Sequence, residues 1–160
     1  MISISFLSAC GKASFESVSK ETIKSVKDTF DEQVKETNKK SGNMHFYLPF
    51  GYEIENESPN NIILKNGSKT YILFNNPQEN TTSDVVYKAT VALFEELDVN
   101  EKFKKEDRLG FVIIKRLEED MNELTIGVGG TKITTQVKTS NMKTEAVVMT
   151  QIANSVENDN

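Results

Sequence analysis

The chain has 160 residues and a mass of 18.0 kDa, the size of one domain with a single hydrophobic core. Its net charge of -5 and its pI of about 5.0 argue against a surface that binds nucleic acid, so we expect no nucleic acid partner. One Cys, one His and no apolar run of 18 residues exclude an internal disulfide, a zinc site built on several cysteines and a transmembrane helix. We therefore expect no metal, no cofactor and no catalytic site.

The only cysteine stands near the start of the chain, in the sequence Leu7-Ser8-Ala9-Cys10. This sequence resembles the lipobox of bacterial lipoproteins, in which a signal peptidase cuts before a cysteine whose sulfur carries a diacylglyceryl group. The resemblance implies that Cys10 is lipidated and that the protein is attached to the extracytoplasmic face of the cell membrane. Two acyl chains supply the double signal that stable anchoring requires.

The residues before the motif depart from the family pattern. A signal peptide has a basic start and an apolar stretch of about 7 to 15 residues, whereas residues 1–9 contain no Lys or Arg. We interpret residues 1–9 as a truncated signal-peptide remnant and expect the reading frame to extend upstream of Met1. The alternative is that residues 2–6 form one strand and that Cys10 is an inert thiol.

Residues 10–43 are polar and nearly neutral, while the acidity of the chain lies from His45 onward. Apolar residues recur here at roughly helical spacing, which predicts a thinly amphipathic helix over residues 15–37. The members of this set are Phe15, Val18, Ile23, Val26, Phe30 and Val34. Two interpretations stay open: a lipid-anchored tether, or a helix that rests on the domain. We place the domain itself at residues 44–160.

The first half of that domain predicts strands followed by a helix. Asn66-Gly67 separates the apolar runs 62–64 and 71–74, which is a strong signal for a β-hairpin. Thr82 or Ser83 caps the helix that follows. One face of this helix is marked by Val86, Ala89, Leu93 and Leu97.

The second half repeats this order. Residues 109–117 predict a strand in which 111–114 are buried on both sides, and an alternating strand follows over 124–128. Gly129-Gly130 makes a tight turn into the strand at 133–137. Ser140 or Asn141 then caps a helix with a clean apolar stripe, formed by Met142, Ala146, Met149, Ala153 and Val156.

Both halves therefore follow the order strand–strand–strand–helix. We predict an α+β fold in which the helices pack on one face of an antiparallel sheet, built from duplicated βββα units and preceded by an N-terminal helix or tether.

An aromatic segment opens the domain, with the sequence Phe-Tyr-Leu-Pro-Phe-Gly-Tyr-Glu-Ile over residues 46–54. It resembles the aromatic-Leu-Pro-x-Gly-Tyr opening of small extracytoplasmic domains in lipoproteins and in sporulation or envelope-stress proteins of Gram-positive bacteria. Alternate aromatic residues are expected to fill the core and the others to form a contact patch. The members are Phe46, Tyr47, Phe50 and Tyr52.

Other chemistry-bearing residues fit structural roles better. No nucleophile motif accompanies His45, and residues 127–132 place Thr and Lys in the wrong order for a phosphate-binding loop, which favours a hairpin turn. The carboxylates of residues 118–123 lack the calcium-loop pattern, so we expect a solvated acidic turn.

We therefore predict a non-enzymatic, lipid-anchored surface protein that binds or modulates another envelope component. Its expected partners are the membrane, through Cys10, and an unknown envelope protein or ligand. The alternatives are a small-ligand-binding or enzymatic domain with a scattered site and, if Cys10 is not lipidated, an intracellular interaction protein.

Overall fold

The computed structural model describes residues 14–160, so residues 1–9 and Cys10 lie outside the described residues. The helices are α1 (Phe15–Phe30), α2 (Val85–Val91) and α3 (Met142–Ser155), with a 3-10 turn at Thr139–Asn141 before α3. The strands are β1 (Lys39–Ser41), β2 (Met44–Phe46), β3 (Glu53–Ser58), β4 (Asn61–Asn66), β5 (Lys69–Asn75), β6 (Val99–Lys105), β7 (Arg108–Arg116), β8 (Met121–Val128), β9 (Thr131–Lys138) and β10 (Glu157–Asn158).

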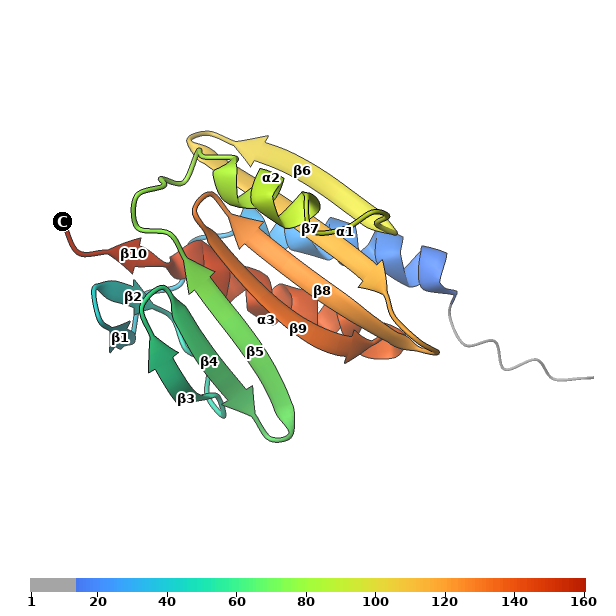
Figure 1. Ribbon diagram of the computed structural model, residues 1–160, viewed down its shortest axis with the longest axis horizontal. Helices are drawn as coiled ribbons and strands as arrows, with labels where there is room; N and C mark the ends of the chain where they lie inside the picture. Colours follow the sequence, from blue (N-terminus) through green and yellow to red (C-terminus); the bar gives the residue numbers. More distant parts are fainter. Residues whose placement is uncertain (1–13) are drawn as a thin grey trace, which may run out of the picture.

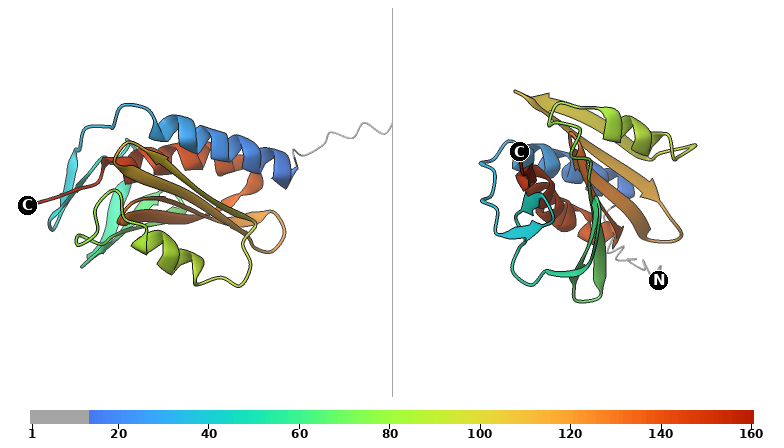
Figure 2. Two further views of the ribbon diagram at one scale, coloured as in Figure 1. Left: turned by 90° about the horizontal axis from the view of Figure 1, so that it is seen from above. Right: turned by 60° about the vertical axis from the view of Figure 1, so that its left-hand side comes forward.

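Within residues 14–160 the strands form two antiparallel sheets (Figure 1). The larger sheet has seven strands in the order β3-β4-β5-β9-β8-β7-β6, and the smaller has three in the order β1-β2-β10. The start of α1 and the C-terminus lie at opposite ends of the long axis (Figures 1 and 2). The predicted α+β class with an antiparallel sheet is therefore confirmed.

The two predicted glycine hairpins are present. β4 and β5 pair up to Asn66 and Lys69, which leaves a two-residue loop in which Gly67 has φ +60°. β8 and β9 are joined by Gly129 and Gly130, and Gly129 has φ +53°. Glycine adopts these positive φ angles without the clash that a Cβ would cause. Residues 127–132 therefore contain a hairpin turn, as predicted, and not a phosphate-binding loop.

The main core lies between one face of the large sheet and the helices α1 and α3 (Figure 2). Four members of the expected stripe, Met142, Ala146, Met149 and Ala153, are buried on α3. The fifth, Val156, follows the end of the helix and is half-buried. α1 contributes Val26 and Phe30, which are 0% and 1% exposed.

Helix α1 is therefore packed into the domain, because its buried residues belong to the same core as the sheet. This is the second of the two interpretations left open for residues 10–43, and it places the start of the packed unit at α1 rather than at residue 44. The helix also ends at Phe30, seven residues before the expected end at Thr37.

Helix α2 lies on the opposite face of the large sheet from α1 and α3 (Figure 2). β7 shows both faces: Val112 and Ile114 belong to the main core, whereas Phe111 and Ile113 pack with Val86 of α2. The prediction that residues 111–114 are buried on both sides is thus confirmed. The prediction that all helices pack on one face of the sheet is wrong, because α2 packs on the face opposite α1 and α3.

The same observation argues against duplicated βββα units. The antiparallel strands β5 and β9 are neighbours, so a two-fold axis relating the halves would run through the sheet and keep α2 and α3 on one face. They lie on opposite faces, and β6 has no counterpart in the first half. The similarity of the halves is limited to the order of their elements.

Candidate functional site

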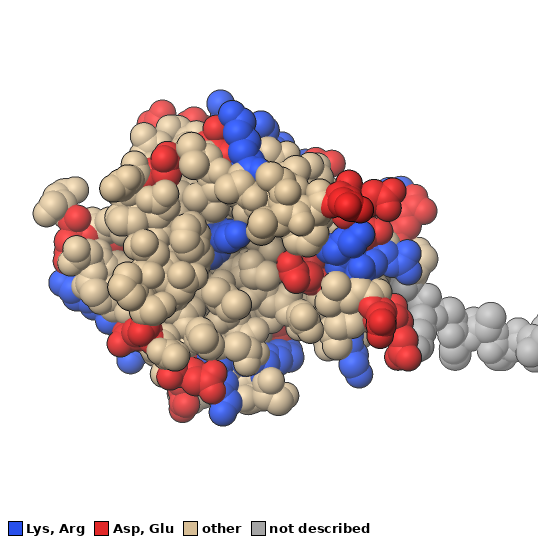
Figure 3. Space-filling model, in the orientation of Figure 1, with Lys and Arg blue, Asp and Glu red and all other residues tan. Residues whose placement is uncertain are grey.

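A groove of about 660 Å³ lies beside α2 on the outer face of the large sheet. Several of its apolar side chains are exposed to solvent: Ile72 of β5 at 47%, Val85 of α2 at 48% and Leu93 just after α2 at 74%. Figure 3 shows this face as predominantly uncharged, with a basic side chain at the centre of a hollow. Soluble domains rarely leave such side chains grouped around a concave surface unless something binds there.

Lys132 of β9 stands in this groove. Its Nζ donates a hydrogen bond to Thr90 Oγ1 at 3.0 Å and lies 5.8 Å from the centre of the Phe74 ring. Thr90 is itself buried and donates to the carbonyl oxygen of Val86 at 2.7 Å. The hydroxyl of Thr90 therefore donates its proton within α2 and accepts the hydrogen bond from Lys132 with a lone pair.

Burial lowers the pKa of the Lys132 ammonium, and the negative charge of Glu123 acts in the opposite direction without offsetting it. Among residues 14–160 no carboxylate lies within ion-pair distance of Lys132. A charge that is taken out of water without a counter-ion costs free energy. The groove thus contains a cation whose partner the described chain does not supply.

The β8–β9 turn positions the loop that leads into α2. The amide of Gly130 donates to the carbonyl oxygen of Asn80 at 3.2 Å, and the amide of Asn76 donates to the carbonyl oxygen of Gly130 at 2.8 Å. A Cβ on Gly129 would lie 2.3 Å from the Asn80 oxygen. The close approach of two backbones holds the loop before α2 against the turn, and Asn76 of this loop lines the groove.

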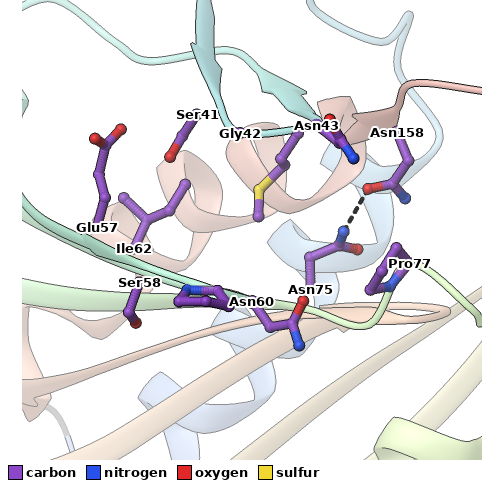
Figure 4. A pocket seen from close by; sticks show the side chains of 12 residues that line it. Ser41, Gly42, Asn43, Glu57, Ser58, Asn60, Ile62, Asn75, Pro77 and Asn158 are labelled. Atoms are coloured by element: carbon purple, nitrogen blue, oxygen red, sulfur yellow. Dashed lines mark hydrogen bonds between the residues drawn. The ribbon is translucent and has the colours of Figure 1, made fainter.

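A second hollow, of about 460 Å³, lies between the small sheet and the β3–β4 hairpin (Figure 4). Its walls include Asn43, Asn60, Asn75 and Asn158. The buried Asn75 donates to Asn158 Oδ1 at 2.6 Å and accepts from Thr131 Oγ1 at 2.9 Å. The amide of Asn75 is engaged on both sides, so this polar hollow offers a weaker case for a ligand than the groove does.

Buried polar chemistry also occurs within the main core. Tyr71 of β5 is fully buried, and its hydroxyl donates to Glu145 Oε2 of α3 at 2.6 Å. Lys69 pairs with the other oxygen of Glu145, and the Tyr52 hydroxyl lies 3.4 Å from that of Tyr71. Burial and the bond to Glu145 raise the pKa of Tyr71. These groups join α3 to β5, and Tyr52 among them also lines a hollow of about 560 Å³ together with residues 48–51.

The four aromatic residues of the predicted contact patch differ in burial, and two of them, Phe50 and Tyr52, line the same hollow. Phe46 is fully buried in the main core, and Tyr52 packs partly buried with its ring centre 5.3 Å from that of Tyr71. Tyr47 is half-buried, and its amide donates to a serine of α3. Phe50 is fully exposed. The structure therefore brings only Phe50 of the four to a fully exposed position.

His45 takes part in a surface cluster. Its Nε2 lies 2.6 Å from Asp159 Oδ1, and Lys40 Nζ donates to Asp159 Oδ2 at 2.9 Å. The bonds from Lys40 and then His45 lower the pKa of the Asp159 carboxyl. The cluster joins the strands of the small sheet to the last residues of the chain, which is a structural role.

Three of the four carboxylates of the expected solvated acidic turn lie exposed at one turn. Glu118, Glu119 and Asp120 are exposed between β7 and β8, whereas Glu123 is half-buried and lines the groove. Within the described part of the chain no three metal-ligating side chains are grouped as a metal site would require. None of the helices formed by residues 14–160 is long and apolar enough to cross a membrane.

Sequence reasoning missed the groove residues Ile72, Phe74, Thr90 and Lys132. One signal was present: residues 71–74 form a continuous apolar run, which indicates a strand with apolar contacts on both faces. The same signal was used for residues 111–114. What the sequence did not indicate is that α2 covers only part of the second face and leaves Lys132 at the open edge.

Comparison with known proteins adds no assignment. Neither the protein-family models nor the curated protein sequences contain a match to this chain.

Proposed function

We propose that this protein is a non-enzymatic binding protein whose ligand occupies the groove between α2 and the large sheet. One observation carries the proposal: an apolar groove with exposed side chains contains a half-buried lysine without a carboxylate partner among residues 14–160. Such a charge makes the fold less stable, and a bound ligand that neutralises it offsets that cost.

Binding rather than catalysis is supported by what surrounds Lys132. A lysine nucleophile needs an acid or base within hydrogen-bonding reach to move protons. In the structure of residues 14–160, the one hydrogen bond of Lys132 is to Thr90, whose own proton is donated to the helix. A small-ligand enzyme therefore has less support than a binding protein.

We further propose that the protein is a lipoprotein anchored at Cys10 to the extracytoplasmic face of the cell membrane. Cys10 stands four residues before Ser14, the N-cap of α1. Four residues span about 14 Å at most, so this anchor would hold the α1 end of the domain close to the lipid. The groove then lies on the face of the sheet away from α1, where it is accessible to an envelope component or a small ligand.

The groove is tested by measuring the binding of decanol, an apolar probe without charge, by calorimetry. We expect saturable binding that Leu93→Asp weakens about tenfold, because a carboxylate then stands at the apolar mouth of the groove. Leu117→Asp is the matched control, since Leu117 is also exposed but lies outside the groove. Absent saturable binding, or equal weakening by the two variants, would overturn the proposed site.

The anchor is tested by the intact mass of the protein isolated from membranes of its own host. We expect a chain that starts at Cys10 and is heavier by a diacylglyceryl group, and we expect Cys10→Ala to leave the membrane fraction. A native protein that is unmodified and absent from membranes would contradict the anchor without affecting the groove.

A further inference from the structure

We propose that the ligand of the groove is an aliphatic monocarboxylate, with its carboxylate on the Lys132 ammonium and its chain along Ile72, Phe74 and Leu93. This inference rests on the proposed function, since it names the ligand class of the same groove. The ligand is identified by the two properties that the groove presents: an apolar wall and a single cation within it.

The hydrogen bonds of Lys132 leave room for a carboxylate. An ammonium has three N–H donors, and one of them is directed to Thr90 Oγ1. A carboxylate oxygen that accepts from the remaining donors forms charge-assisted bonds, which are about twice as strong as neutral ones. The surrounding apolar side chains strengthen this attraction further, because they keep water away from the pair.

The position of Glu123 limits the ligand to one carboxylate. Glu123 of β8 is paired with Gln136 of β9, four residues along the strand from Lys132, so the backbone positions of Glu123 and Lys132 lie about 13 Å apart along the sheet. The charge of Glu123 is nevertheless close enough to act on the pKa of Lys132. Both side chains line the groove. A second carboxylate at the far end of the ligand would approach the negative charge of Glu123, whereas an aliphatic end would not.

The size of the groove agrees with a small molecule. Its volume of about 660 Å³ falls within the range of about 300 to 1,000 Å³ that is typical of small-molecule sites. Between Lys132 and Glu123 the floor is formed by Thr125 and Thr134, whose hydroxyl oxygens lie 2.9 Å apart and bond to each other. One of these hydroxyls donates to the other, so a ligand chain that crosses them covers a pair in which a single O–H donor is left to find a partner.

The test compares three probes that share one chain and differ in the head group: decanoate, decanol and decylammonium. Decanoate and decylammonium are kept below their micelle concentrations at pH 7, and decanol is kept below its solubility limit. Calorimetry is carried out on the wild type, Lys132→Met and Lys138→Met. Lys138 is the matched control, because it lies on the same strand, is exposed and does not line the groove.

We expect the wild type and Lys138→Met to bind decanoate about tenfold more tightly than decanol, and decylammonium more weakly than decanol. Lys132→Met should bind decanol as the wild type does and lose the preference for decanoate. Lys132→Gln, which keeps a polar end without the charge, gives the same comparison if Lys132→Met does not fold.

The outcomes separate this inference from the proposed function. Equal binding of decanol and decanoate by the wild type, or a preference for decanoate that survives the loss of the Lys132 charge, would overturn the monocarboxylate and leave the groove as a binding site. Absence of binding by decanol as well as decanoate would overturn the proposed function itself.

Discussion

At the scale of single residues, Lys132 supplies the charge proposed to bind the ligand, and burial of this charge lowers the stability of the free protein. Its ammonium is half-buried beside Phe74 and under α2, and burial lowers its pKa. A methionine has a similar length and no charge to desolvate. The free protein would therefore be at least as stable without this lysine, which is the behaviour expected of a residue that serves binding rather than folding.

We predict that Lys132→Met raises the free energy of unfolding at pH 7 by about 1 kcal/mol or less. The ordinary lysine pKa is 10.5, and that of folded Lys132 is lower. Between these two values the unfolded chain binds more protons than the folded one, so the wild type gains stability as the pH rises. The advantage of Lys132→Met should therefore shrink as the pH approaches 10.5.

Urea unfolding of both proteins at several pH values between 7 and 10 measures this difference. Tyr71 also affects this range, but it is unchanged in both proteins and cancels from the comparison. A variant that is less stable than the wild type at pH 7, or an advantage that grows with pH, would show that Lys132 stabilises the fold.

The residue scale is also where sequence prediction of the site was weakest. The contact patch at Phe46, Tyr47, Phe50 and Tyr52 was inferred from the density of aromatic residues. Simple alternation does not describe their burial, because Phe46 is buried and Phe50, four residues later, is fully exposed. Lys132 gave no such signal, because a lysine between Thr131 and Ile133 is expected on the polar face of any strand. Its burial depends on α2, whose Thr90 lies 42 residues earlier in the chain.

At the scale of elements, local patterns predicted what they determine directly. The apolar stripe of α3 and the glycine turns at Gly67 and Gly129 depend on neighbouring residues and were located correctly. The end of α1 at Phe30 was not, since Val34 continues the apolar spacing without reaching the core. α2 is short for a similar reason: Leu93 continues its face but lies exposed at the mouth of the groove.

The β8–β9 turn offers an element-scale prediction, because it supports the loop before α2. We expect Gly129→Ala to lower the free energy of unfolding by about 2 to 3 kcal/mol, through both the positive φ and the clash of its Cβ with Asn80. Gly67→Ala has a similar φ of +60° but no atom within 4 Å of its Cβ. It should cost only about 1 kcal/mol.

Thermal or urea unfolding compares the two variants, and decanol binding reports on the groove. Gly129→Ala should weaken decanol binding because it displaces the start of α2, while Gly67→Ala should not. Equal losses of stability would mean that backbone strain alone matters and that the contact with Asn80 does not position the loop.

At the scale of the whole molecule, the two faces of the large sheet have different roles. One face is sealed by α1 and α3 and contains most of the buried apolar residues, including a tyrosine–glutamate bond between sheet and helix. The other face is covered by the seven residues of α2 and remains partly open. Stability therefore resides mainly on the first face, and the second is available for a ligand.

This asymmetry was the part of the fold that the sequence did not determine. Continuous apolar runs at residues 71–74 and 111–114 indicated two covered faces, while the repeated order of elements suggested helices on one face. The choice between them depends on which way the chain turns after β5, at residues 76–84. That segment contacts Gly129 and Gly130. The sequence indicates the glycine turn itself but not its contact with a loop about 50 residues earlier.

The measurement that tests the account most directly is a titration of the isotope-labelled protein with decanoate, in which the NMR shifts of the backbone amides report where the ligand binds. The account predicts saturable shifts that concentrate at Ile72, Thr90, Leu93 and Lys132, with the residues around Asn75 and Asn158 unaffected. Shifts centred on the asparagine-lined hollow, or no saturable shifts on any face, would contradict it.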